Sequence, residues 1–395
     1  MKYKNAGEIL PAELVEEIQR YVQGEFLYIP KKDKQTNRSI TEYKNELEKR
    51  NLRIYKMHLE GMKNKQLAQN FSLAESSIRR IIIAERKRFE FMSDKIKTLL
   101  SNWNLPNENI KQIYPSVWQV GKDYVLKIYR EPKSLMRNIT INRHLESMDI
   151  PVGKLLLTAD DREYIENDGE YFFVSKKLLG SNIVSLKFGN KIAEAMGEII
   201  AKLHLAFENL EDKIELSQGS LLDEMKGWVK ESFEQSGFKN ISRDEYDAVI
   251  DSLEQSYDKL PVGLIHRDVH FGNFLFHNKK FSGYIDFDLS QKNIRVFDLC
   301  YFSLSILSEK DKFEINKENW FDFVKNVFLG YNKIRTLTTE EKESAVFVME
   351  CIELLFIAYF EGQEDFAQAK SACEVFNFIK ENERKISKIL MKEGV

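Results

Sequence analysis

The sequence has few of the residues that build disulfide-linked, zinc-binding or membrane-spanning proteins. Its 395 residues include three cysteines and no Cys-x-x-Cys pair, which argues against a disulfide framework and against a zinc site. The longest apolar stretch, Cys351 to Phe360, is about ten residues long and contains Glu353, whereas a membrane span needs roughly twenty. The amino-terminal stretch also lacks an apolar core of signal-peptide length. These absences predict a cytoplasmic protein that does not enter a membrane.

Neither sign of charge dominates the whole chain, which has a net charge of −3, but its two parts differ. Residues 1–95 hold 20 Lys and Arg against 14 Asp and Glu, and the remainder holds 39 against 48. Hydrophobic residues make up 43% of the chain, so a sizeable core can be buried and disorder is not indicated. The basic part is compatible with nucleic acid and the acidic part with a cationic small molecule, and charge alone establishes neither.

A helix-turn-helix pattern occupies residues 50–88. Residues 63–71 predict a short helix, residues 72–74 a tight turn, and residues 75–89 a second helix whose outward side chains would reach base edges or phosphates. The candidate DNA contacts are Ser76, Ser77, Arg79 and Arg80. The stretch resembles the helix-turn-helix of Mor-type transcription activators, which implies DNA binding. The same pattern also fits a small helical packing module whose arginines form a solvated face.

The pattern changes after residues 90–108, which we interpret as a linker. From Ile110 to Phe173, short alternating segments predict the strands of a sheet around one helix. From Lys191 onward the pattern is mostly helical, interrupted by loops and short strands at residues 263–293. No heptad repeat indicates an oligomeric state, which the sequence leaves open.

The interrupting stretch, GLIHRDVHFGNFLFHNKKFSGYIDFDLS, holds the polar residues that phosphoryl transfer uses. Such transfer needs a carboxylate that orients the attacking hydroxyl and accepts its proton, and oxygen ligands that hold Mg²⁺ on the phosphates. Asp268 suits the first role. Asn273 and Asp286 lie on loops that flank one predicted hairpin and suit the second. The joint occurrence of His-x-Asp, the spaced Asn and an apolar-flanked Asp argues against a chance arrangement.

The order HxDxxxxN, then IDFD, then DL is similar to the signature of the aminoglycoside phosphotransferase and choline kinase families, over roughly residues 108–385. The resemblance implies an α+β, protein-kinase-like fold with an antiparallel-sheet N-lobe and a helical C-lobe, preceded here by a small all-α helix-turn-helix domain. The domains expected from it are residues 1–95, 96–180 and 181–395. It also implies ATP or GTP and Mg²⁺ as cofactors, and a small molecule with a hydroxyl group as the acceptor.

The resemblance assigns the nucleotide site to the sheet lobe. Lys127, on an alternating strand, is similar to the kinase lysine that pairs with the α- and β-phosphates; the alternative is an ordinary strand lysine on a solvated face. The turn before it lacks glycine, and Ser116 is its candidate phosphate contact. The segment YFFVSKKLLG resembles the hinge that binds adenine through backbone groups. The candidate groups there are those of Ser175, Lys176, Lys177 and Leu178.

Several polar residues around the central motif have supporting or acceptor roles in this interpretation. Asp298 resembles the buried family aspartate that braces the catalytic loop, and His266 is predicted to be structural. His270 either lines the acceptor pocket or caps the loop, and these alternatives stay open. Asp288 is a second candidate for the acceptor side.

One position departs from the family pattern. The family places an acidic residue on the helix after the lysine, and the alignment puts Asn138 there. An amide can hydrogen-bond to Lys127 but supplies no charge. The partner of the lysine therefore comes from elsewhere, for example Glu131, or the lysine is held differently.

The acceptor pocket is expected between the catalytic loop and segments of the helical part, namely Leu222–Trp228, Tyr301–Ser308 and Met349–Glu361. Carboxylates in these segments would suit an amine-bearing acceptor, although an ordinary charge on the helix surface is the favoured interpretation of any single one. They are Glu224, Glu350, Glu353 and Glu361.

Two functions follow from the sequence. The first is a small-molecule phosphotransferase that moves the γ-phosphate of ATP or GTP to a hydroxyl group. The alternative is a DNA-binding transcriptional regulator with a ligand-sensing, non-catalytic kinase-like domain. A protein kinase is disfavoured because the sequence has no glycine-rich loop and no Ala-Pro-Glu segment after Asp286.

Overall fold

The computed structural model describes residues 15, 37–71, 73–183, 190–208, 210, 219–308, 315–363, 365–392 and 394. The chain divides into two units, residues 1–50 and 51–395, and helix α3 (Asn37–Leu59) runs from the first into the second. Everything described below lies in the unit of residues 51–395.

The predicted helix-turn-helix pair is present as α4 (Asn64–Asn70) and α5 (Glu75–Leu99). Leu67 of α4 packs with Ile78 and Ile82 of α5 in a small apolar cluster. Ser72, in the predicted turn, lies outside the described residues. The candidate DNA contacts lie on the first turns of α5, where Ser76, Arg79 and Arg80 are exposed and Ser77 is half-buried.

Helix α5 is longer than the sequence pattern predicted. It continues past residue 89 to Leu99 and is followed by a 3-10 turn, η1 (Leu100–Trp103), so the prediction of a linker over residues 90–108 is wrong in its first part. The physical reason is that Ile96, Leu99 and Trp103 keep an apolar side facing the neighbouring sheet, where they are buried with Trp118. One helix therefore contributes to two apolar clusters.

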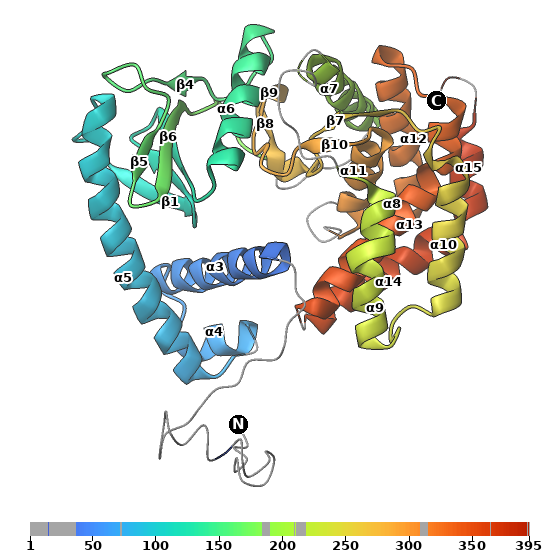
Figure 1. The fold of residues 1–395 in the computed structure, drawn as a ribbon, viewed down its shortest axis with the longest axis horizontal. Helices are drawn as coiled ribbons and strands as arrows, with labels where there is room; N and C mark the ends of the chain where they lie inside the picture. Colours follow the sequence, from blue (N-terminus) through green and yellow to red (C-terminus); the bar gives the residue numbers. More distant parts are fainter. Residues whose placement is uncertain are drawn as a thin grey trace. The chain divides into compact units, whose positions relative to one another are not determined.

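The sheet lobe is an antiparallel sheet in the strand order β1-β2-β3-β6-β4, with β5 also paired to β6 (Figure 1). Its strands are β1 (Ile110–Tyr114), β2 (Val117–Val120), β3 (Tyr124–Tyr129), β4 (Leu155–Leu156), β5 (Ile165–Asn167) and β6 (Glu170–Lys176). Helix α6 (Pro132–Ser147) connects β3 to β4, and Pro132 at its first turn suits a helix start. In the sheet, Trp118, Leu126 and Phe172 are fully buried.

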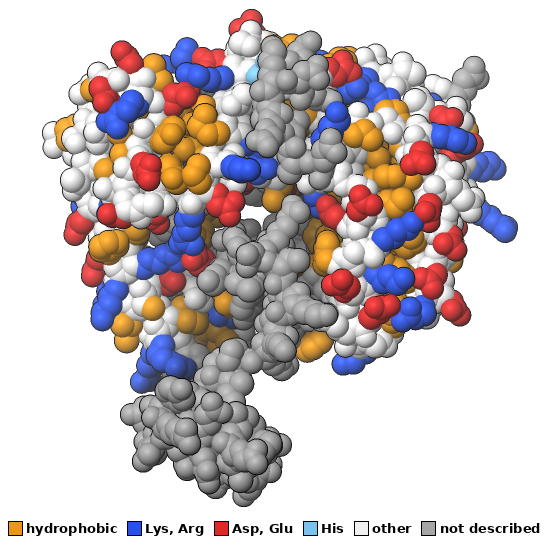
Figure 2. All heavy atoms as spheres, in the orientation of Figure 1, with side chains coloured by type: hydrophobic (Ala, Val, Ile, Leu, Met, Phe, Trp, Pro, Cys, Tyr) orange, Lys and Arg blue, Asp and Glu red, His pale blue; other side chains and the backbone are white. Residues whose placement is uncertain are grey.

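The helical lobe surrounds two small two-stranded sheets, β7 with β10 and β8 with β9 (Figure 1). The strands are β7 (Val262–Ile265), β8 (Phe274–His277), β9 (Lys280–Tyr284) and β10 (Gln291–Ile294). The helices are α7 (Asn190–Glu208), α8 (Leu221–Glu224), the π-helical turn η2 (Met225–Val229), α9 (Lys230–Ser236), α10 (Arg243–Tyr257), η3 (Phe271–Asn273), α11 (Val296–Ser308), α12 (Lys317–Ile334), α13 (Thr339–Gly362), α14 (Phe366–Glu381) and α15 (Glu383–Leu390). On the face shown in Figure 2, acidic and basic side chains are intermixed over this lobe.

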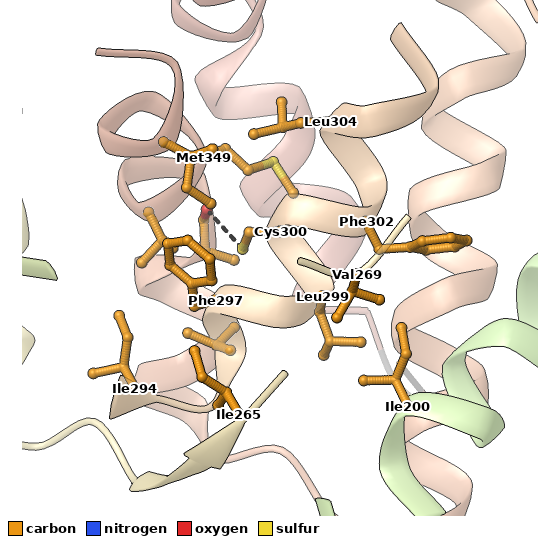
Figure 3. Packing of buried hydrophobic residues seen from close by; sticks show 14 of the residues in the cluster. Ile200, Ile265, Val269, Ile294, Phe297, Leu299, Cys300, Phe302, Leu304 and Met349 are labelled. Atoms are coloured by element: carbon orange, nitrogen blue, oxygen red, sulfur yellow. Dashed lines mark hydrogen bonds between the residues drawn. The ribbon is translucent and has the colours of Figure 1, made fainter. Parts of the chain in front are cut away.

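The core of the helical lobe fixes the loop that carries Asp268. Val269, the next residue, is fully buried and lies beside Leu299 and Phe302 of α11 (Figure 3). On the same helix the thiol of Cys300 donates to the carbonyl of Ala345 at 3.4 Å. Close packing leaves little room for displacement, so the loop and α11 are held in one fixed relation.

The antiparallel-sheet lobe and the helical lobe confirm the predicted α+β two-lobe architecture. The predicted domain limits at residues 95 and 180 stay predictions. In the described part of the chain, no helix combines the length and the apolar character that crossing a membrane requires.

Candidate active site

Neutral hydrogen-bond donors surround the carboxylate of Asp268, in the loop between β7 and β8. The amide nitrogen of Asn273 donates to Asp268 Oδ2 at 2.9 Å, and the hydroxyl of Tyr301 on α11 donates to Oδ1 at 3.0 Å. His270 Nε2 lies 3.6 Å from Oδ2. Burial would raise the pKa of Asp268, but hydrogen bonding by His270 and Tyr301, together with the nearby His266 ring, outweighs burial and holds that pKa well below its usual value. The carboxylate is therefore ionised at neutral pH.

The backbone of this loop is tied to Asp298 on α11, which is fully buried. Asp298 accepts from the backbone N–H groups of His266 and Arg267, each at 2.9 Å, and lies 3.0 Å from His204 Nε2. Arg267 has a left-handed backbone with φ of 67°, a conformation that a non-glycine residue keeps only when its surroundings enforce it. The two bonds to Asp298 provide that constraint beside Asp268.

A chain of bonds through His266 brings the second predicted loop next to the first. His266 Nδ1 accepts from the N–H of Asp268 at 3.4 Å, so the ring proton is on Nε2, which donates to the carbonyl of Ile285 at 3.1 Å. The N–H of Ile285 in turn donates to the carbonyl of Asn273 at 3.1 Å. The charge of Asp268 acts on Asp286 and opposes the fall of its pKa. The structure therefore brings Asp268, Asn273 and Asp286 together.

Lys127 of β3 is paired with two carboxylates from the segment after β9. Its Nζ lies 2.9 Å from Asp286 Oδ1 and 3.0 Å from Asp288 Oδ2, and 3.3 Å from the hydroxyl of Tyr129. Burial alone would lower the pKa of Lys127, but the two carboxylates hold it well above its usual value. The charge of Lys127 is also the main reason why the pKa of Asp286 is lowered. Lys127 is thus a half-buried, paired cation and not a lysine on a solvated face.

The partner of Lys127 comes from elsewhere than the helix position of Asn138, as the first sequence alternative had it, but it is the pair Asp286 and Asp288 and not the suggested Glu131. Asn138 is buried and donates to Asp288 Oδ1 at 2.7 Å instead. Both carboxylates reach the lysine from the segment after β9, where Asp286 has a left-handed backbone with φ of 66°. Asp288 is the residue that stands beside the lysine in place of a helix carboxylate.

Asp288, predicted as a candidate for the acceptor side, is engaged by the sheet lobe through both carboxylate oxygens. Tyr129 donates to Oδ1 at 2.5 Å, and Lys127 donates to Oδ2. Arg137 of α6 donates to the backbone carbonyl of Asp288 at 2.6 Å. Burial raises the pKa of Asp288, and Lys127 opposes that rise. These contacts join the two lobes, and the acceptor role of Asp288 stays a prediction.

Ser116 lies at the tip of the β1–β2 hairpin, directly beside Lys127. Its carbonyl accepts from the N–H of Ile128 at 2.9 Å, and Val117 is paired with Lys127 across the sheet. The turn therefore stands next to the lysine, as the predicted phosphate contact requires, while the hydroxyl of Ser116 enters no bond within the described residues.

The predicted hinge residues span the last two residues of β6, Ser175 and Lys176, and the two residues after it. The N–H groups of Lys176 and Lys177 donate to the carbonyls of Lys154 and Asp123, both at 2.7 Å, so these two donors are already used within the protein. Lys176, Lys177 and Leu178 line an open hollow of about 390 Å³, with His277 and Ser282 on its other side.

Gly180 ends the hinge in a way that only glycine allows. Its φ is +108°, and a Cβ atom there would lie 2.5 Å from the carbonyl oxygen of Phe276. Past it, Ser181 and Phe276 exchange backbone hydrogen bonds of 3.1 and 2.9 Å. The connection between the lobes is thereby fastened to β8.

For His270 the structure shows the loop-capping alternative, and the acceptor-pocket alternative stays a prediction. Its Nδ1 accepts from the N–H of Gly272 at 3.0 Å, which caps the short turn η3. The ring proton is therefore on Nε2, the atom that faces Asp268.

The four carboxylates expected near the acceptor have different surroundings. Glu224 is bonded to Arg267 at 2.6 Å, and Glu361 accepts from Asn240 at 2.5 Å. Glu350 is fully buried with Lys380 3.9 Å away. Glu353 is buried on α13, and burial raises its pKa to about 8.

Glu353 is the one of these four carboxylates that affects the pKa of Tyr301, the residue on α11 that bonds Asp268. It raises the pKa of Tyr301, after burial and Asp268. Phe356, one turn further along α13, contacts the Tyr301 ring at 5.9 Å between centroids. The hydroxyl of Tyr301 therefore lies under the influence of two carboxylates, Asp268 and Glu353.

Two tyrosines at this site were not identified from the sequence as site residues. The sequence placed Tyr301 only at the start of a candidate lining segment, and it gave no site role to Tyr129. A signal for Tyr129 exists in the strand alternation, because it lies two residues after Lys127 and so on the same face of β3. Tyr301 lies three residues after Asp298 and thus one turn along α11, a signal that has meaning only once Asp298 is known to face the loop.

The oxygen atoms at Asn273 and Asp286 suit Mg²⁺. Asn273 uses its amide nitrogen toward Asp268, which leaves its amide oxygen for other contacts, and Asp286 is ionised because its pKa is lowered. Mg²⁺ prefers such hard oxygen ligands, usually one or two from protein, with phosphate and water oxygens completing the shell. Among the described residues no cluster of three or more His, Cys, Asp or Glu side chains offers an all-protein metal site.

A sheet lobe and a helical lobe with a lysine and three acidic or amide side chains between them define a protein-kinase-like fold. The family model described as the phosphotransferase enzyme family matches residues 111–317, and this chain belongs to that family. It is accordingly a phosphotransferase that acts on hydroxyl groups.

Similar proteins agree with this assignment. A homoserine kinase of Zymomonas mobilis is 24% identical over 245 residues, 60% of this chain and 73% of that protein. A homoserine kinase of Rhodopseudomonas palustris is 30% identical over 171 residues, and the match covers about half of it, 48%, and 41% of this chain. The solved structure of the amicoumacin kinase hAmiN, in complex with AMP-PNP and Ca²⁺, is 18% identical with a TM-score of 0.55, covering 74% of this chain and 96% of that one. This last likeness shows the shared fold.

Proposed function

We propose that this protein transfers the γ-phosphate of ATP or GTP to a hydroxyl group of a small, amine-bearing acceptor. The observation that carries the proposal is the meeting of Asp268, Asn273 and Asp286 with the lobe-crossing pair of Lys127 and Asp286. Phosphoryl transfer is catalysed mainly by positioning and by neutralising charge. This arrangement supplies a base on one side and a cation on the other.

Asp268 is the proposed base. An ionised carboxylate accepts a hydrogen bond from the acceptor hydroxyl and takes its proton as the oxygen attacks phosphorus. Asn273 and the Asp298-braced backbone hold Asp268 in place, and His266 holds the loop to Ile285. Lys127 is proposed to contact the α- and β-phosphates, with Ser116 beside it. The hinge residues 175–178 are proposed to lie near the adenine or guanine ring of the nucleotide.

Asn273 and Asp286 are the residues that would hold Mg²⁺. When bound, the ion neutralises charge on the phosphate oxygens. The work of the protein there is to present one amide oxygen and one carboxylate at adjoining loops, which the bond from Ile285 to Asn273 secures.

The surroundings of Glu353 are the reason for proposing that the acceptor has an amine group. This carboxyl is 5% exposed, and it acts on the same Tyr301 hydroxyl that bonds Asp268. With a pKa of about 8 it is largely neutral at pH 7, and an ammonium group beside it would favour the ionised form. Binding of the amine would then release a proton, an effect that calorimetry in buffers of different ionisation enthalpy measures.

Turnover of nucleotide with a panel of acceptors tests the proposed function. The purified chain is mixed with Mg-ATP or Mg-GTP and with L-homoserine, small amino alcohols, sugars or aminoglycosides, and the phosphorylated product is identified by mass spectrometry. Asp268→Asn should lower the transfer rate by about 10²–10⁴-fold because the base is lost. The matched control is Asp258→Asn, which changes an exposed aspartate outside the site.

Two results would contradict the proposal. One is transfer by Asp268→Asn at the rate of the unaltered chain. The other is tight binding of nucleotide with no transfer to any acceptor of a broad panel, which would favour the non-catalytic regulator.

A second proposed function is DNA binding through residues 50–88. The observation that favours it is that Ser76, Arg79 and Arg80 are exposed on the first turns of α5, the second helix of the pair. Arg80 also donates to the hydroxyl of Ser77 at 3.4 Å, which sets it along the helix. A recognition helix places these first turns in a major groove.

A mobility-shift assay on DNA from upstream of the gene tests this second function. Arg79→Gln with Arg80→Gln should weaken binding and reduce its dependence on salt, because phosphate contacts release counterions. The same change of charge at Arg384 and Lys388, exposed on α15, is the control. Equal binding by both double variants would exclude α5 as the contact.

A further inference from the structure

The two oxygens of Asp268 differ in how many donors they already meet. An ionised carboxylate offers about two hydrogen-bond sites on each oxygen. Oδ2 accepts from the amide of Asn273, and the Nε2 proton of His270 faces it at 3.6 Å. Oδ1 accepts from Tyr301, and within the described part of the chain that is its one hydrogen bond. The place left for a further donor is therefore on Oδ1, beside the hydroxyl of Tyr301.

Tyr301 is held firmly in that position by its ring. It stacks on Phe297 at 5.9 Å and contacts Phe356 of α13 at 5.9 Å between centroids. The guanidinium of Arg267 also lies over the Phe297 ring, with its Cζ atom 5.8 Å from the ring centroid. Because the ring is fixed by α11 and α13, its hydroxyl has a fixed direction and fixes the orientation of the Asp268 carboxylate in turn.

We propose that Oδ1 of Asp268 is the atom that receives the acceptor hydroxyl, and that Tyr301 is the positioning residue that turns Oδ1 toward it. This inference rests on the proposed function and adds to it the place of the acceptor. An oxygen donating to Oδ1 would lie next to the hydroxyl of Tyr301, whose ring contacts Phe356 of α13. Oδ2, occupied by its own loop, keeps the carboxylate anchored.

The arrangement also explains why a tyrosine suits this position better than phenylalanine. Phenylalanine would keep the ring contacts and remove one hydrogen bond to a charged group. Rotation of the carboxylate about its Cβ–Cγ bond would then be opposed only at Oδ2, by Asn273 and the facing His270 ring. The reacting oxygen would spend less time in line with the phosphate, and a small displacement at a reacting atom has a large effect on rate.

Steady-state kinetics of Tyr301→Phe test the inference, with the acceptor found by the panel and with Mg-ATP. Loss of one hydrogen bond to a charged group predicts a fall in kcat of about 10- to 100-fold. The KM and the dissociation constant for nucleotide should stay within about twofold, since Lys127 and Asp286 are untouched. Tyr257→Phe is the matched control, because that hydroxyl bonds Ser220 away from the loop.

The outcomes separate this inference from the function on which it rests. If Asp268→Asn is inactive while Tyr301→Phe keeps the kcat of the unaltered chain, the function stands and the inference is overturned. If Asp268→Asn retains transfer, the function itself fails. A loss in Tyr301→Phe that comes with an equal loss of nucleotide affinity, or with a lower thermal midpoint than Tyr257→Phe, would show general disturbance and would also overturn it.

Discussion

The loop of Asp268 and the segment of Asp286 and Asp288 carry the same kind of side chain in opposite surroundings. The Asp268 carboxylate meets neutral donors, all from the helical lobe. Asp286 and Asp288 meet a cation, Lys127, and Asp288 also meets Tyr129, both from the sheet lobe. Ion pairs therefore join the two lobes at the segment of Asp286 and Asp288, and the hydrogen bonds of Asp268 stay within the helical lobe.

This difference separates two tasks. The base is positioned by one lobe, so its geometry does not depend on how far the lobes close. The phosphate side is assembled by both lobes, so it responds to their approach. Because Asp288 takes the place of a helix carboxylate beside Lys127, the contact between lobes is concentrated on residues 286–288.

The sharpest way to break the comparison is to neutralise one carboxylate on each side. Both Asp268→Asn and Asp286→Asn should reduce transfer by orders of magnitude, about 10²-fold or more. Nucleotide affinity should persist in Asp268→Asn and fall in Asp286→Asn, which loses a metal ligand and the partner of Lys127. Equilibrium titration with a fluorescent nucleotide distinguishes them, and equal affinities would remove the division of tasks.

Lys127→Met tests the side that joins the lobes. It should weaken nucleotide binding and also destabilise the free protein, because two carboxylates are left without their cation. Breaking a fully buried pair costs about 3–5 kcal/mol. Here the Asp286 and Asp288 side chains are 45% and 38% exposed, so about 1–2 kcal/mol is expected after screening by solvent. Urea unfolding measures this cost, and Lys325→Met on α12 is the control.

Asn138→Glu restores the family's acidic residue and sharpens the comparison further. Asn138 is buried and bonds Asp288, so a carboxylate there would face another carboxylate and lose a hydrogen bond. We expect a loss of about 1–3 kcal/mol in the free energy of unfolding and no gain in turnover. Higher kcat in this variant would show that Lys127 lacks a partner in the unaltered chain.

Helix α13 offers a third environment, in which buried carboxyl groups have few charged or hydrogen-bonding partners to offset the cost of burial. Burial raises the pKa of Glu350 and of Glu353 to about 8, from 4.5 for an unperturbed Glu. Between pH 4.5 and 8 the folded chain keeps these protons while the unfolded chain has lost them, so the free energy of unfolding falls as pH rises. Glu350→Gln and Glu353→Gln should each flatten that dependence. Thermal midpoints measured from pH 5 to 8 check it, and an unchanged slope contradicts it.

Much of the fold and the central motif were predictable because they depend on patterns within short stretches of sequence. Alternating strands and helical periods gave the two lobes, and Asp268, Asn273 and Asp286 were recognisable because their spacing fits loops around one hairpin. The contacts of Asp288 were not predictable. They depend on Asp286 adopting a left-handed backbone and on α6 lying against the segment, and neither is encoded in spacing.

The role of α5 escaped prediction for a related reason. The sequence from residue 90 onward is charged enough to resemble a linker, and its apolar side shows only once the sheet that covers it is in place. Ile96 and Leu99 belong to the core of the sheet, and Phe89 stacks on Trp118 at 5.3 Å. Pattern alone does not reveal a helix face whose partner lies further along the chain.

The shared helix has a consequence for the ancestry and handling of this protein. Since α5 supplies side chains to the helix-turn-helix cluster at one end and to the sheet core at the other, a junction between residues 89 and 99 would strip Trp118 of its cover. Gene fusion or recombination can exchange the front part without harm only at a point upstream of Phe89. A kinase fragment that begins at residue 96 would expose the Trp118 surface that Phe89 and Met92 cover and would be prone to self-association.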